Sequence, residues 1–391
     1  MYLEFRKRVC VVGLGYIGLP TACILADHGY SVFGVDIDKK VIAKIKSANF
    51  LGSEPKLQDL LLKVIANNSI ELSMNVVSAE IFIITVPTPL DAEYKPDISY
   101  VDNAIESIMP HITSGNLVLI ESTCPIGTTE LMAKKLQSIC PNIHIAYCPE
   151  RVLPGNIIYE LIHNDRIVGG IDNASTSHAL EFYKSFISGE ILATDTKTAE
   201  AIKLAENTYR DINIAYANEL SMIADHLNLN VNDLIRLANR HPRVNILQPG
   251  VGVGGHCIAV DPYFLISSAP NFTRLISNAR KVNDEKTKWV VEKISNVAKK
   301  NRVKFIACLG LTYKPNVSDV RNSPALEIVQ LLNKEFEVFA VDPYVEDSYL
   351  IDDAVKRAEM IVILVAHNEF MSVPEKISNN TILLDFTSKC E

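Results

Sequence analysis

A glycine-rich turn near the start of the chain constrains its fold more than any other feature of the sequence. The run RVCVVGLGYIGLPTACILADHGYSVFGVDID places an apolar strand before Gly13, Gly15 and Gly18, and a helix and a second strand after them. In such a unit the first glycine permits a tight turn and the second lets a pyrophosphate approach the backbone. The third lets the helix pack closely on the strand, and the helix N-terminus favours phosphate charge. The spacing therefore predicts a dinucleotide-binding fold.

Asp36 narrows the choice of dinucleotide. It ends the second strand, where an acid can bind the hydroxyls of the adenine ribose. The same carboxylate repels a 2′-phosphate, so it favours NAD over NADP as cofactor. The glycine motif alone is a weak signal, and a glycine turn in a fold that binds another ligand is the alternative.

Length, composition and charge exclude several other classes of protein. A chain of 391 residues is too long for one ordinary core and suggests two or three domains. Hydrophobic residues make up 48% and charged residues 21%, and no apolar run reaches the ~18 residues of a membrane span. The N-terminus shows no signal-peptide pattern, so we expect a cytoplasmic protein. A net charge of −8 argues against general nucleic-acid binding.

The cysteines give no metal-binding or disulfide pattern. None forms a CxxC pair, and no His/Cys spacing suggests zinc, so we expect no metal site. Cys10, Cys23 and Cys308 lie in apolar segments and are interpreted as small buried hydrophobic residues. Only Cys257 has neighbours that suggest chemistry. The eight cysteines are Cys10, Cys23, Cys124, Cys140, Cys148, Cys257, Cys308 and Cys390.

Strands and helices alternate along the first half of the chain. Further strand-like runs at 81–86, 117–121 and 143–148 predict a mainly parallel sheet covered on both faces. From about Thr196 the pattern changes to one helix of more than 25 residues without Gly or Pro, longer than a typical globular helix. Such a helix connects domains or packs against a partner subunit. More helix is expected at 231–238 and at about 271–300.

The last 90 residues resemble a second, looser copy of the beginning. Four later runs match four earlier ones in order: VKFIACLGLTYKP matches VCVVGLGYIG, EVFAVDPY matches SVFGVDID, AEMIVILVAH matches AEIFIITVPTP, and TILLDFTS matches NLVLIEST. We therefore predict an α/β protein with two doubly wound Rossmann-like domains joined by a central helical domain with one long helix. The expected domains are residues 1–195, 196–300 and 301–391.

The second copy keeps only Gly310 in its turn, so we do not expect it to bind NAD. Lys314 and Arg321 follow that turn, and paired positive groups suit a phosphate-bearing ligand. Two solvated surface charges are the alternative.

The segment GVGVGGHCIAVDP predicts reactive chemistry. Cys257 follows two glycines and a histidine, in a Gly-rich loop that can hold a thiol open to substrate, and Asp261 lies four residues on. A cysteine buried in a structural loop is the alternative. Lys203 and Asn207 share one face of the long helix and could stabilise an oxyanion, although an ordinary exposed helix face has the same spacing.

Two polar residues follow strands at the edge where active sites of open α/β sheets gather. Glu150 follows one strand directly after CP, and Thr123 ends another in ESTCP. Both are therefore candidate site residues.

Together these segments resemble the UDP-glucose/GDP-mannose dehydrogenase family over essentially the whole chain. The runs that carry the resemblance, in the family's order, are GLGYIGLP, VPTP, ESTCPIGTT, CPERVLPGN, EAIKLAENTYRDINIAYANE, GVGGHCIAVDP and GLTYKPNVSDVRNSP. The resemblance implies an NAD domain, a central helical domain and a nucleotide-sugar domain. It also implies oxidation of a sugar 6-hydroxyl to an aldehyde, capture of that aldehyde by a thiolate, and a second oxidation to a thioester that water releases as a carboxylate.

The resemblance also implies roles for individual residues. Cys257 would be the nucleophile, Lys203 and Asn207 would stabilise the oxyanion, and Asp261, Thr123 and Glu150 would handle water and protons. The cofactor would be bound by Gly13, Gly15, Tyr16, Ile17, Gly18, Asp36, Val86, Thr88, Thr123 and Arg321. The nucleotide sugar would be bound by Glu150, Arg151, Lys203, Asn207, Arg210, His241, Arg243, Gly254 and Lys314.

One departure from the family pattern bears on the substrate. UDP-glucose members typically carry a second acid four residues after the first, whereas here Pro154 follows Glu150 at that spacing. The form PERVLPG resembles the branch that oxidises 2-acetamido sugars. Within that branch the run RHPRVNILQPGVGVGGHCIAVDP favours UDP-N-acetylmannosamine, and Arg243 is expected to contact it, either within its own chain or across a dimer.

Three alternatives stay open at this point. A UDP-N-acetylglucosamine 6-dehydrogenase would use the same chemistry on the other configuration of the second sugar carbon. A two-electron hydroxyacid dehydrogenase would share the glycine turn and the long helix, but would need no thiol. A nucleotide-sugar-binding or redox-sensing protein would show no turnover. We also expect a homodimer, a role in surface polysaccharide biosynthesis, and no nucleic-acid or membrane partner.

Overall fold

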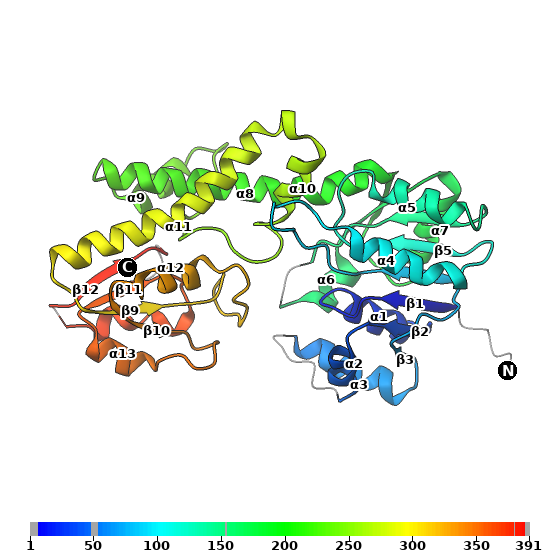
Figure 1. Cartoon of the computed structure of the whole chain (residues 1–391), viewed down its shortest axis with the longest axis horizontal. Coiled ribbons are helices and arrows are strands. Elements are labelled where there is room, and N and C mark those ends of the chain that lie inside the picture. Colours follow the sequence, from blue (N-terminus) through cyan, green and yellow to red (C-terminus); the bar gives the residue numbers. More distant parts are fainter. Residues whose placement is uncertain (1–6, 48–53, 153–154, 379, 388–391) are drawn as a thin grey trace. The chain divides into compact units, whose positions relative to one another are not determined.

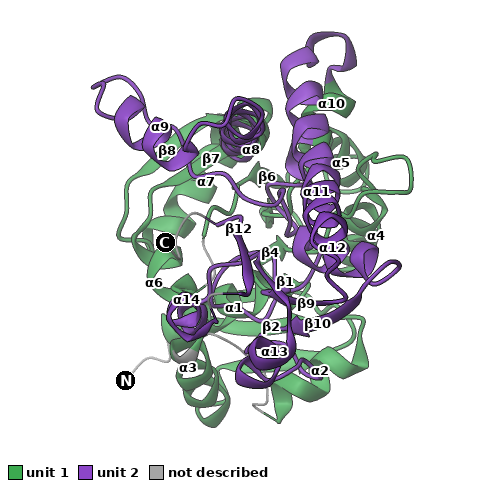
Figure 2. Cartoon of the chain, turned by 90° about the vertical axis from the view of Figure 1, so that its left-hand side faces the viewer, with its two compact units in different colours: residues 1–205, 263–268 green, residues 206–262, 269–391 purple. Residues whose placement is uncertain are grey.

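The structure is a computed structural model that describes residues 7–47, 54–152, 155–378 and 380–387. The chain divides into two compact units, which Figure 2 colours separately: Met1–Ala205 with Tyr263–Ser268, and Glu206–Pro262 with Ala269–Glu391. Each unit contains one sheet. The boundaries at residues 195 and 300 stay a prediction.

The first unit is built on an eight-stranded sheet in the order β3-β2-β1-β4-β5-β6-β7-β8. All neighbouring strands are parallel except β6 and β7, which pair antiparallel. The order reverses direction between β1 and β4, which is where open α/β sheets bind ligands at the carboxyl ends of their strands. The strands are β1 (Arg8–Val12), β2 (Ser31–Val35), β3 (Ile70–Ser73), β4 (Ile81–Ile84), β5 (Leu117–Ile120), β6 (His144–Tyr147), β7 (Arg166–Gly170) and β8 (Ile191–Asp195).

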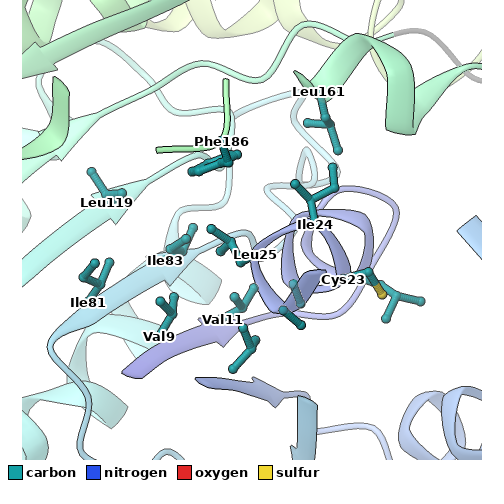
Figure 3. Packing of buried hydrophobic residues seen from close by; sticks show 14 of the residues in the cluster. Val9, Val11, Cys23, Ile24, Leu25, Ile81, Ile83, Leu119, Leu161 and Phe186 are labelled. Atoms are coloured by element: carbon teal, nitrogen blue, oxygen red, sulfur yellow. The ribbon is translucent and has the colours of Figure 1, made fainter. Parts of the chain in front are cut away.

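Helices cover both faces of this sheet. Because side chains alternate along a strand, Val9 and Val11 of β1 join one buried cluster, whereas Cys10 and Val12 join the other. Figure 3 shows the first cluster, in which Leu25 lies close to the strand residues. The helices are α1 (Gly18–Asp27), α2 (Lys39–Lys46), α3 (Pro55–Ala66), α4 (Ser99–Ile108), α5 (Thr128–Gln137), α6 (Ile157–His163) and α7 (Asn173–Lys184), with a 3-10 turn η1 (Met109–His111).

The predicted long helix is confirmed as the 31-residue α8. Its first turns are tied to the first sheet by Glu200, which is fully buried and accepts hydrogen bonds from the backbone amides of Gly127 (2.6 Å) and Thr129 (2.7 Å) at the start of α5. These amides lack helical partners, so the carboxylate acts as a cap supplied from another helix. The central helices are α8 (Thr196–His226), α9 (Val231–Ala238), α10 (Asp261–Ser268) and α11 (Arg274–Lys300), with a 3-10 turn η2 (Pro270–Phe272).

The second unit contains a four-stranded parallel sheet in the order β10-β9-β11-β12. The four runs matched in the sequence form these strands, and their order reproduces β2-β1-β4-β5 of the first sheet. The predicted fold class, with two doubly wound parts, is confirmed. The elements are β9 (Phe305–Leu309), α12 (Pro324–Leu332), β10 (Glu337–Val341), α13 (Ile351–Arg357), β11 (Met360–Ile363), η3 (Asn368–Phe370), α14 (Val373–Lys376) and β12 (Ile382–Asp385). Figure 1 labels the four strands with α12 and α13, and Figure 2 labels α14.

Candidate active site

The glycine turn after β1 has the geometry that a bound dinucleotide needs. Gly13 has φ +95°, and a Cβ there would lie 2.9 Å from the carbonyl oxygen of Thr85. A Cβ on Gly18 would lie 1.8 Å from the carbonyl oxygen of Gly13, so only glycine lets α1 start this close to the strand. At Gly15 a Cβ would meet nothing within 4 Å, so the backbone there is open to a ligand. The three positions thus fit a pyrophosphate above the turn.

Asp36 holds this turn in shape. Its carboxylate accepts hydrogen bonds from the backbone amides of Leu14 (2.9 Å) and Asp38 (2.9 Å). The side chain is half-buried at the end of β2, where it remains reachable from solvent. Its position suits an adenine ribose, and the predicted ribose contact stays a prediction. The flanking Tyr16 and Ile17 pack against the first core, and the hydroxyl of Tyr16 donates to Glu54 (3.2 Å).

Polar groups gather at the carboxyl ends of β4 and β5. Thr85 donates a hydrogen bond from Oγ1 to the carbonyl oxygen of Gly13 (2.7 Å), and Ser122 donates from Oγ to that of Val86 (2.7 Å). Neither Thr85 nor Ser122 was among the predicted site residues, although each adjoins a predicted position in VPTP or ESTCP. Val86, Thr88 and Thr123 are half-buried at this edge. Their side chains are therefore available to a ligand beside the glycine turn.

Glu150 and Lys203 meet at the end of β6. The ammonium of Lys203 donates to the main-chain oxygen of Glu150. The Glu150 carboxylate accepts a hydrogen bond from the amide of Val152 (2.7 Å) and lies 3.7 Å from the guanidinium of Arg166. Arg151 donates to the main-chain oxygen of Asp165. Two predicted residues, Lys203 and Glu150, are thus joined through the backbone of Glu150. The Glu150 carboxylate pairs with Arg166, which was not among the predicted site residues.

Arg166 belongs to a buried polar cluster beneath this edge. It is 4% exposed, and its neighbours Glu121 and Glu150 are 4% and 5% exposed. Burial raises the pKa of Glu121, against the opposing effects of Arg166 and a hydrogen bond from the hydroxyl of Tyr183 (2.7 Å). Burial also raises the pKa of the neighbouring Cys148 thiol to about 12, so this cysteine is protonated and unreactive.

Cys257 lies in the turn that leads into α10. Its side chain is half-buried, and its main-chain oxygen accepts hydrogen bonds from the amides of Val260 (3.0 Å) and Asp261 (2.8 Å). Asp261, 3% exposed, accepts a hydrogen bond at Oδ2 from the side-chain amide of Asn207 (2.6 Å). Since Asn207 lies one turn after Lys203 on α8, one face of that helix carries two predicted site residues, and one of them reaches the cysteine turn.

Loop residues of the second sheet brace the cysteine turn. The amide of Gly255 donates to the main-chain oxygen of Arg321 (3.1 Å), and the side-chain amide of Asn322 donates to that of Gly255 (3.1 Å). A Cβ on Gly254 would lie 2.4 Å from the main-chain oxygen of Asn322, so this backbone approach requires glycine. The ring of Tyr313 lies 3.0 Å from a Cβ built on Gly255. The cysteine turn therefore depends on the loop that also carries Lys314 and Arg321.

A network of buried polar side chains holds the backbone at Gly250, seven residues before Cys257. The amide of Gly250 donates to Oδ1 of Asn218 (2.9 Å), and the Asn218 amide donates to Asn283 (2.9 Å). Asn283 donates in turn to the carboxylate of Asp211 (2.8 Å), which also pairs with Arg280 at 2.6 Å. These residues are at most 4% exposed apart from Gly250. Helices α8 and α11 thus fix the backbone that precedes Cys257.

The predicted cation Arg321 is held by a carboxylate. Its guanidinium donates to both carboxylate oxygens of Asp319, from Nε (3.0 and 3.1 Å) and from Nη2 (2.6 Å). The hydrogen bonding of Arg321 to Asp319 is the largest cause of the raised pKa of Arg321, and Tyr313 and Cys257 add to it electrostatically. Arg321, paired with Asp319, therefore lies within electrostatic range of Cys257.

Other predicted residues lie apart from these contacts or outside the description. Arg210, His241 and Arg243 are exposed on α8 and in the turn after α9, and no hydrogen bond joins them to the cysteine turn in the described ranges. Lys314 is half-buried in the loop after β9. Pro154 lies outside the described residues. Among the residues that the structure describes, no cluster of His, Cys, Asp or Glu could hold a metal ion.

A mainly parallel sheet with an open glycine turn and an acid after β2, together with a braced thiol, is typical of an NAD-dependent oxidoreductase. The chain belongs to the UDP-glucose/GDP-mannose dehydrogenase family. Three models of that family match it in order: the NAD binding domain over residues 7–187, the central domain over 197–285 and the UDP binding domain over 307–389. The cofactor is NAD, and the family relationship predicted from the sequence is confirmed.

Individual relatives are similar over nearly their whole length. A UDP-N-acetyl-D-mannosamine dehydrogenase of Methanocaldococcus jannaschii is 47% identical, over 96% of this chain and 91% of that protein. An NDP-N-acetyl-D-galactosaminuronic acid dehydrogenase of Ralstonia nicotianae is 41% identical, over 98% and 96%. The solved structure of a UDP-D-ManNAc dehydrogenase from Pyrococcus horikoshii matches with TM-score 0.92 and 39% identity, over 98% and 96%. The chain thus oxidises a UDP-sugar with NAD.

No helix in the described ranges combines the length and the apolar character that crossing a membrane requires.

Proposed function

We propose that the protein oxidises the 6-hydroxyl of UDP-N-acetyl-D-mannosamine to a carboxylate in two successive two-electron steps, through a thioester on Cys257. The carrying observation is the half-buried cysteine turn, in which Asp261 is anchored to Asn207 and Gly255 to the loop of the UDP binding domain. A hydroxyacid dehydrogenase of the two-electron type needs no such thiol. The proposal therefore assigns the second oxidation to Cys257.

NAD bound at the glycine turn would accept one hydride from the sugar's sixth carbon in each oxidation. The residues proposed to hold it are Gly13, Gly15, Tyr16, Ile17, Gly18, Asp36, Val86, Thr88, Thr123 and Arg321. The open backbone at Gly15 and the half-buried carboxylate of Asp36 support this assignment. Asp36 would bind the ribose hydroxyls while its Oδ2 still accepts the hydrogen bond from the Leu14 amide. A carboxylate has enough acceptor positions to bind the ribose and to hold the turn.

The covalent steps belong to this chain's own side chains. The Cys257 thiolate adds to the aldehyde carbon and forms a thiohemiacetal, whose oxyanion Lys203 and Asn207 would stabilise. After the second oxidation the carbon carries a thioester, and water attacks it to release the carboxylate and the thiolate. Asp261, whose carboxylate accepts a hydrogen bond from Asn207, would take the proton of that water.

Lys203 has a second property that suits its role. Its ammonium is already bound to the main-chain oxygen of Glu150, so its position is fixed before any substrate arrives. A donor that needs no reorganisation stabilises developing negative charge most effectively. Glu150 would contribute through this anchoring and through its buried carboxylate, with Thr123 on the neighbouring strand as a second proton-handling group.

The remaining predicted residues are assigned to the nucleotide sugar. They are Arg151, Arg210, His241, Arg243, Gly254 and Lys314. Lys314 lies within the part of the chain that matches the UDP binding domain, and a cation there suits the diphosphate. Arg210 and Arg243 are exposed cations. They would contact the substrate if a second chain supplied them or if the segments that carry them moved when the substrate bound.

The mannosamine assignment follows the relatives that carry that name at 47% and 39% identity. The 41% identical relative named for a galactosaminuronic acid shows that 2-acetamido sugars of other configuration are handled by similar chains. UDP-N-acetylglucosamine is therefore the alternative substrate to test beside UDP-N-acetylmannosamine.

The experiment that tests the thioester compares Cys257→Ala with Cys140→Ala, each assayed with UDP-N-acetylmannosamine and NAD. Cys140 is also half-buried but lies after α5, away from the site residues, which makes it a matched control. We expect Cys257→Ala to form no carboxylate and Cys140→Ala to match the wild type. Carboxylate production at the wild-type rate by Cys257→Ala would rule the thioester out.

We also propose a cytoplasmic homodimer that serves surface polysaccharide biosynthesis. The dimer is supported by a stripe of exposed apolar side chains on α8, Tyr209, Tyr216 and Ile223, spaced seven residues apart and 68%, 54% and 47% exposed. Seven residues make two helical turns, so the three share one face that a second α8 could cover. Light scattering of the wild type and of Tyr216→Lys tests this: a monomeric wild type would refute it.

A further inference from the structure

The second sheet keeps the turn-and-acid arrangement of the first, but it uses the acid differently. Gly310 has φ +97°, as Gly13 has +95°, and the amide of Leu311 donates to Asp342 (2.6 Å) as that of Leu14 donates to Asp36. Asp342 follows β10 as Asp36 follows β2. Whereas Asp36 is half-buried, Asp342 is 1% exposed and cannot reach a ribose.

The side chain of His367 covers Asp342. The ring is fully buried, and its Nε2 lies 3.0 Å from Oδ2 of Asp342 and 3.2 Å from Oγ1 of Thr312. Its Nδ1 accepts a hydrogen bond from the backbone amide of Asn316 (2.9 Å). Because Nδ1 accepts, the proton of the neutral ring is on Nε2 and is donated toward Asp342. Burial acts against the charge of Asp342, but the His367 hydrogen bond and the backbone amides lower its pKa, so it stays ionised.

The same ring fixes the loop that carries Lys314. Asn316 has φ +59°, a left-handed conformation that asparagine adopts more readily than other non-glycine residues. Its amide is tied to His367, and its side-chain oxygen accepts from the amide of Asn368 (3.1 Å). Thr312 donates from Oγ1 to the main-chain oxygen of Lys314 (3.0 Å). Lys314 is thus held on both sides by groups that contact the imidazole.

We propose that His367 is a positioning residue for the nucleotide-sugar site: its Nδ1 holds the Thr312–Asn316 loop so that Lys314 meets the diphosphate of the substrate. The inference rests on the proposed role of Lys314. The positioning role also explains how a dinucleotide-type turn can serve a different ligand. The histidine covers the acid that would otherwise bind a ribose, and the loop that it holds presents a cation to the ligand instead.

Two substitutions separate this role from plain neutralisation of Asp342. His367→Asn keeps an acceptor at the place of Nδ1, so the loop stays held, but loses the donor to Asp342. His367→Gln keeps a donor at the place of Nε2, so Asp342 stays paired, but loses the acceptor for Asn316. Binding of UDP alone to the full-length protein, measured by calorimetry, then reports the loop, and thermal unfolding reports the buried acid.

We expect His367→Gln to weaken UDP binding about tenfold with little change in Tm, since one hydrogen bond to the loop is lost. In turnover, KM for the UDP-sugar should rise by a similar factor while kcat and the NAD affinity stay within about twofold. His367→Asn should lower Tm and keep UDP binding within about twofold. Thr312→Val, which removes only a hydroxyl, should weaken UDP binding several-fold. Ser348→Ala is the matched control: the Ser348 hydroxyl donates to the main-chain oxygen of Asp342 (2.7 Å), not to its carboxylate or to the loop, so its loss should change neither UDP binding nor Tm.

The reverse pattern, with UDP binding kept by His367→Gln and lost by His367→Asn, would overturn the inference. His367 would then serve only to pair the buried charge of Asp342. Lys314→Ala serves as the reference. If it weakens UDP binding while His367→Gln and Thr312→Val do not, the positioning role fails and the proposed function stands. If Lys314→Ala has no effect, the proposed contact of Lys314 with the substrate fails, and the positioning role fails with it.

Discussion

Lys286 on α11 gives the most quantitative test of the packing of the second unit. Its side chain is 2% exposed, and its ammonium donates to Oγ of Ser221 on α8 (2.8 Å) and lies 3.9 Å from the centre of the Trp289 ring. Burial is the main cause that lowers the pKa of Lys286 from 10.5 to about 7; the charge of Lys293 acts in the same direction and that of Asp225 opposes both. The folded protein thus holds a lysine that loses its proton close to neutral pH.

The sign of the effect on stability follows from the two pKa values. Below about pH 7 both the folded and the unfolded states carry the charge, so the folded state bears the full cost of burying it. Above about pH 10.5 neither state is charged and the cost is gone. Between these limits the unfolded state binds more protons, and stability rises with pH. For a shift from 10.5 to about 7 this contribution grows by about 2 kcal/mol between pH 7 and pH 9.

The perturbation is Lys286→Met, which keeps the chain length and removes the charge. Trp289 is the only tryptophan of the chain and adjoins Lys286, so its fluorescence during urea unfolding reports this helix pair. We expect the stability of wild type minus that of the variant to rise by about 2 kcal/mol from pH 7 to pH 9. The exposed neighbour Lys288, changed to Met, is the matched control and should show no such trend.

A difference between Lys286→Met and wild type that stays constant from pH 7 to pH 9 would refute this reasoning. It would mean that Ser221 and the Trp289 ring keep the buried ammonium as stable as an exposed one.

Three further changes test other contacts. Asp36→Ala should weaken NAD binding at least about tenfold and relax discrimination against NADP, because a charged acceptor for the ribose is lost; unchanged kinetics with both cofactors would remove Asp36 from the site. Lys203→Ala should lower kcat about 10²- to 10³-fold with near-normal NAD affinity, as expected for an oxyanion donor; wild-type turnover would make it an ordinary helix-face lysine. Glu200→Ala should destabilise the first unit by about 2–4 kcal/mol in thermal unfolding, because it leaves buried amides of α5 without acceptors; a loss below about 0.5 kcal/mol would show that water replaces the carboxylate.

Much of the fold could be predicted from local patterns. The glycine turn, the acid after β2 and the four repeated runs are each encoded within about ten neighbouring residues, and the four later runs form the strands of the second sheet. The short β7 and β8, with the antiparallel step from β6 to β7, were not predicted. RIVGG and ILATD are too short, and carry too little apolar alternation, to identify a strand or its direction.

The candidate site was predictable where its residues are short motifs, and not where they act over long distances in sequence. Cys257 and Asp261 stand four residues apart in one short motif, so both could be identified as candidates from the sequence. Arg166, His367 and Asn283 escaped prediction because their partners lie 16, 25 and 72 residues away. Hydrophobic periodicity indicates which face of an element is buried, but it does not indicate which buried polar group will find which partner.

The central claim is that Cys257 carries a second oxidation, and counting NADH tests it most directly. Purified protein, NAD and a limiting amount of UDP-N-acetylmannosamine or UDP-N-acetylglucosamine are mixed, and NADH formed per sugar consumed is measured by absorbance. The account predicts two NADH per UDP-N-acetylmannosamine and little reaction with the glucosamine compound. Two with the glucosamine compound instead would keep the mechanism and change the substrate. One NADH per sugar with either substrate would contradict the thioester mechanism and the role given to Cys257.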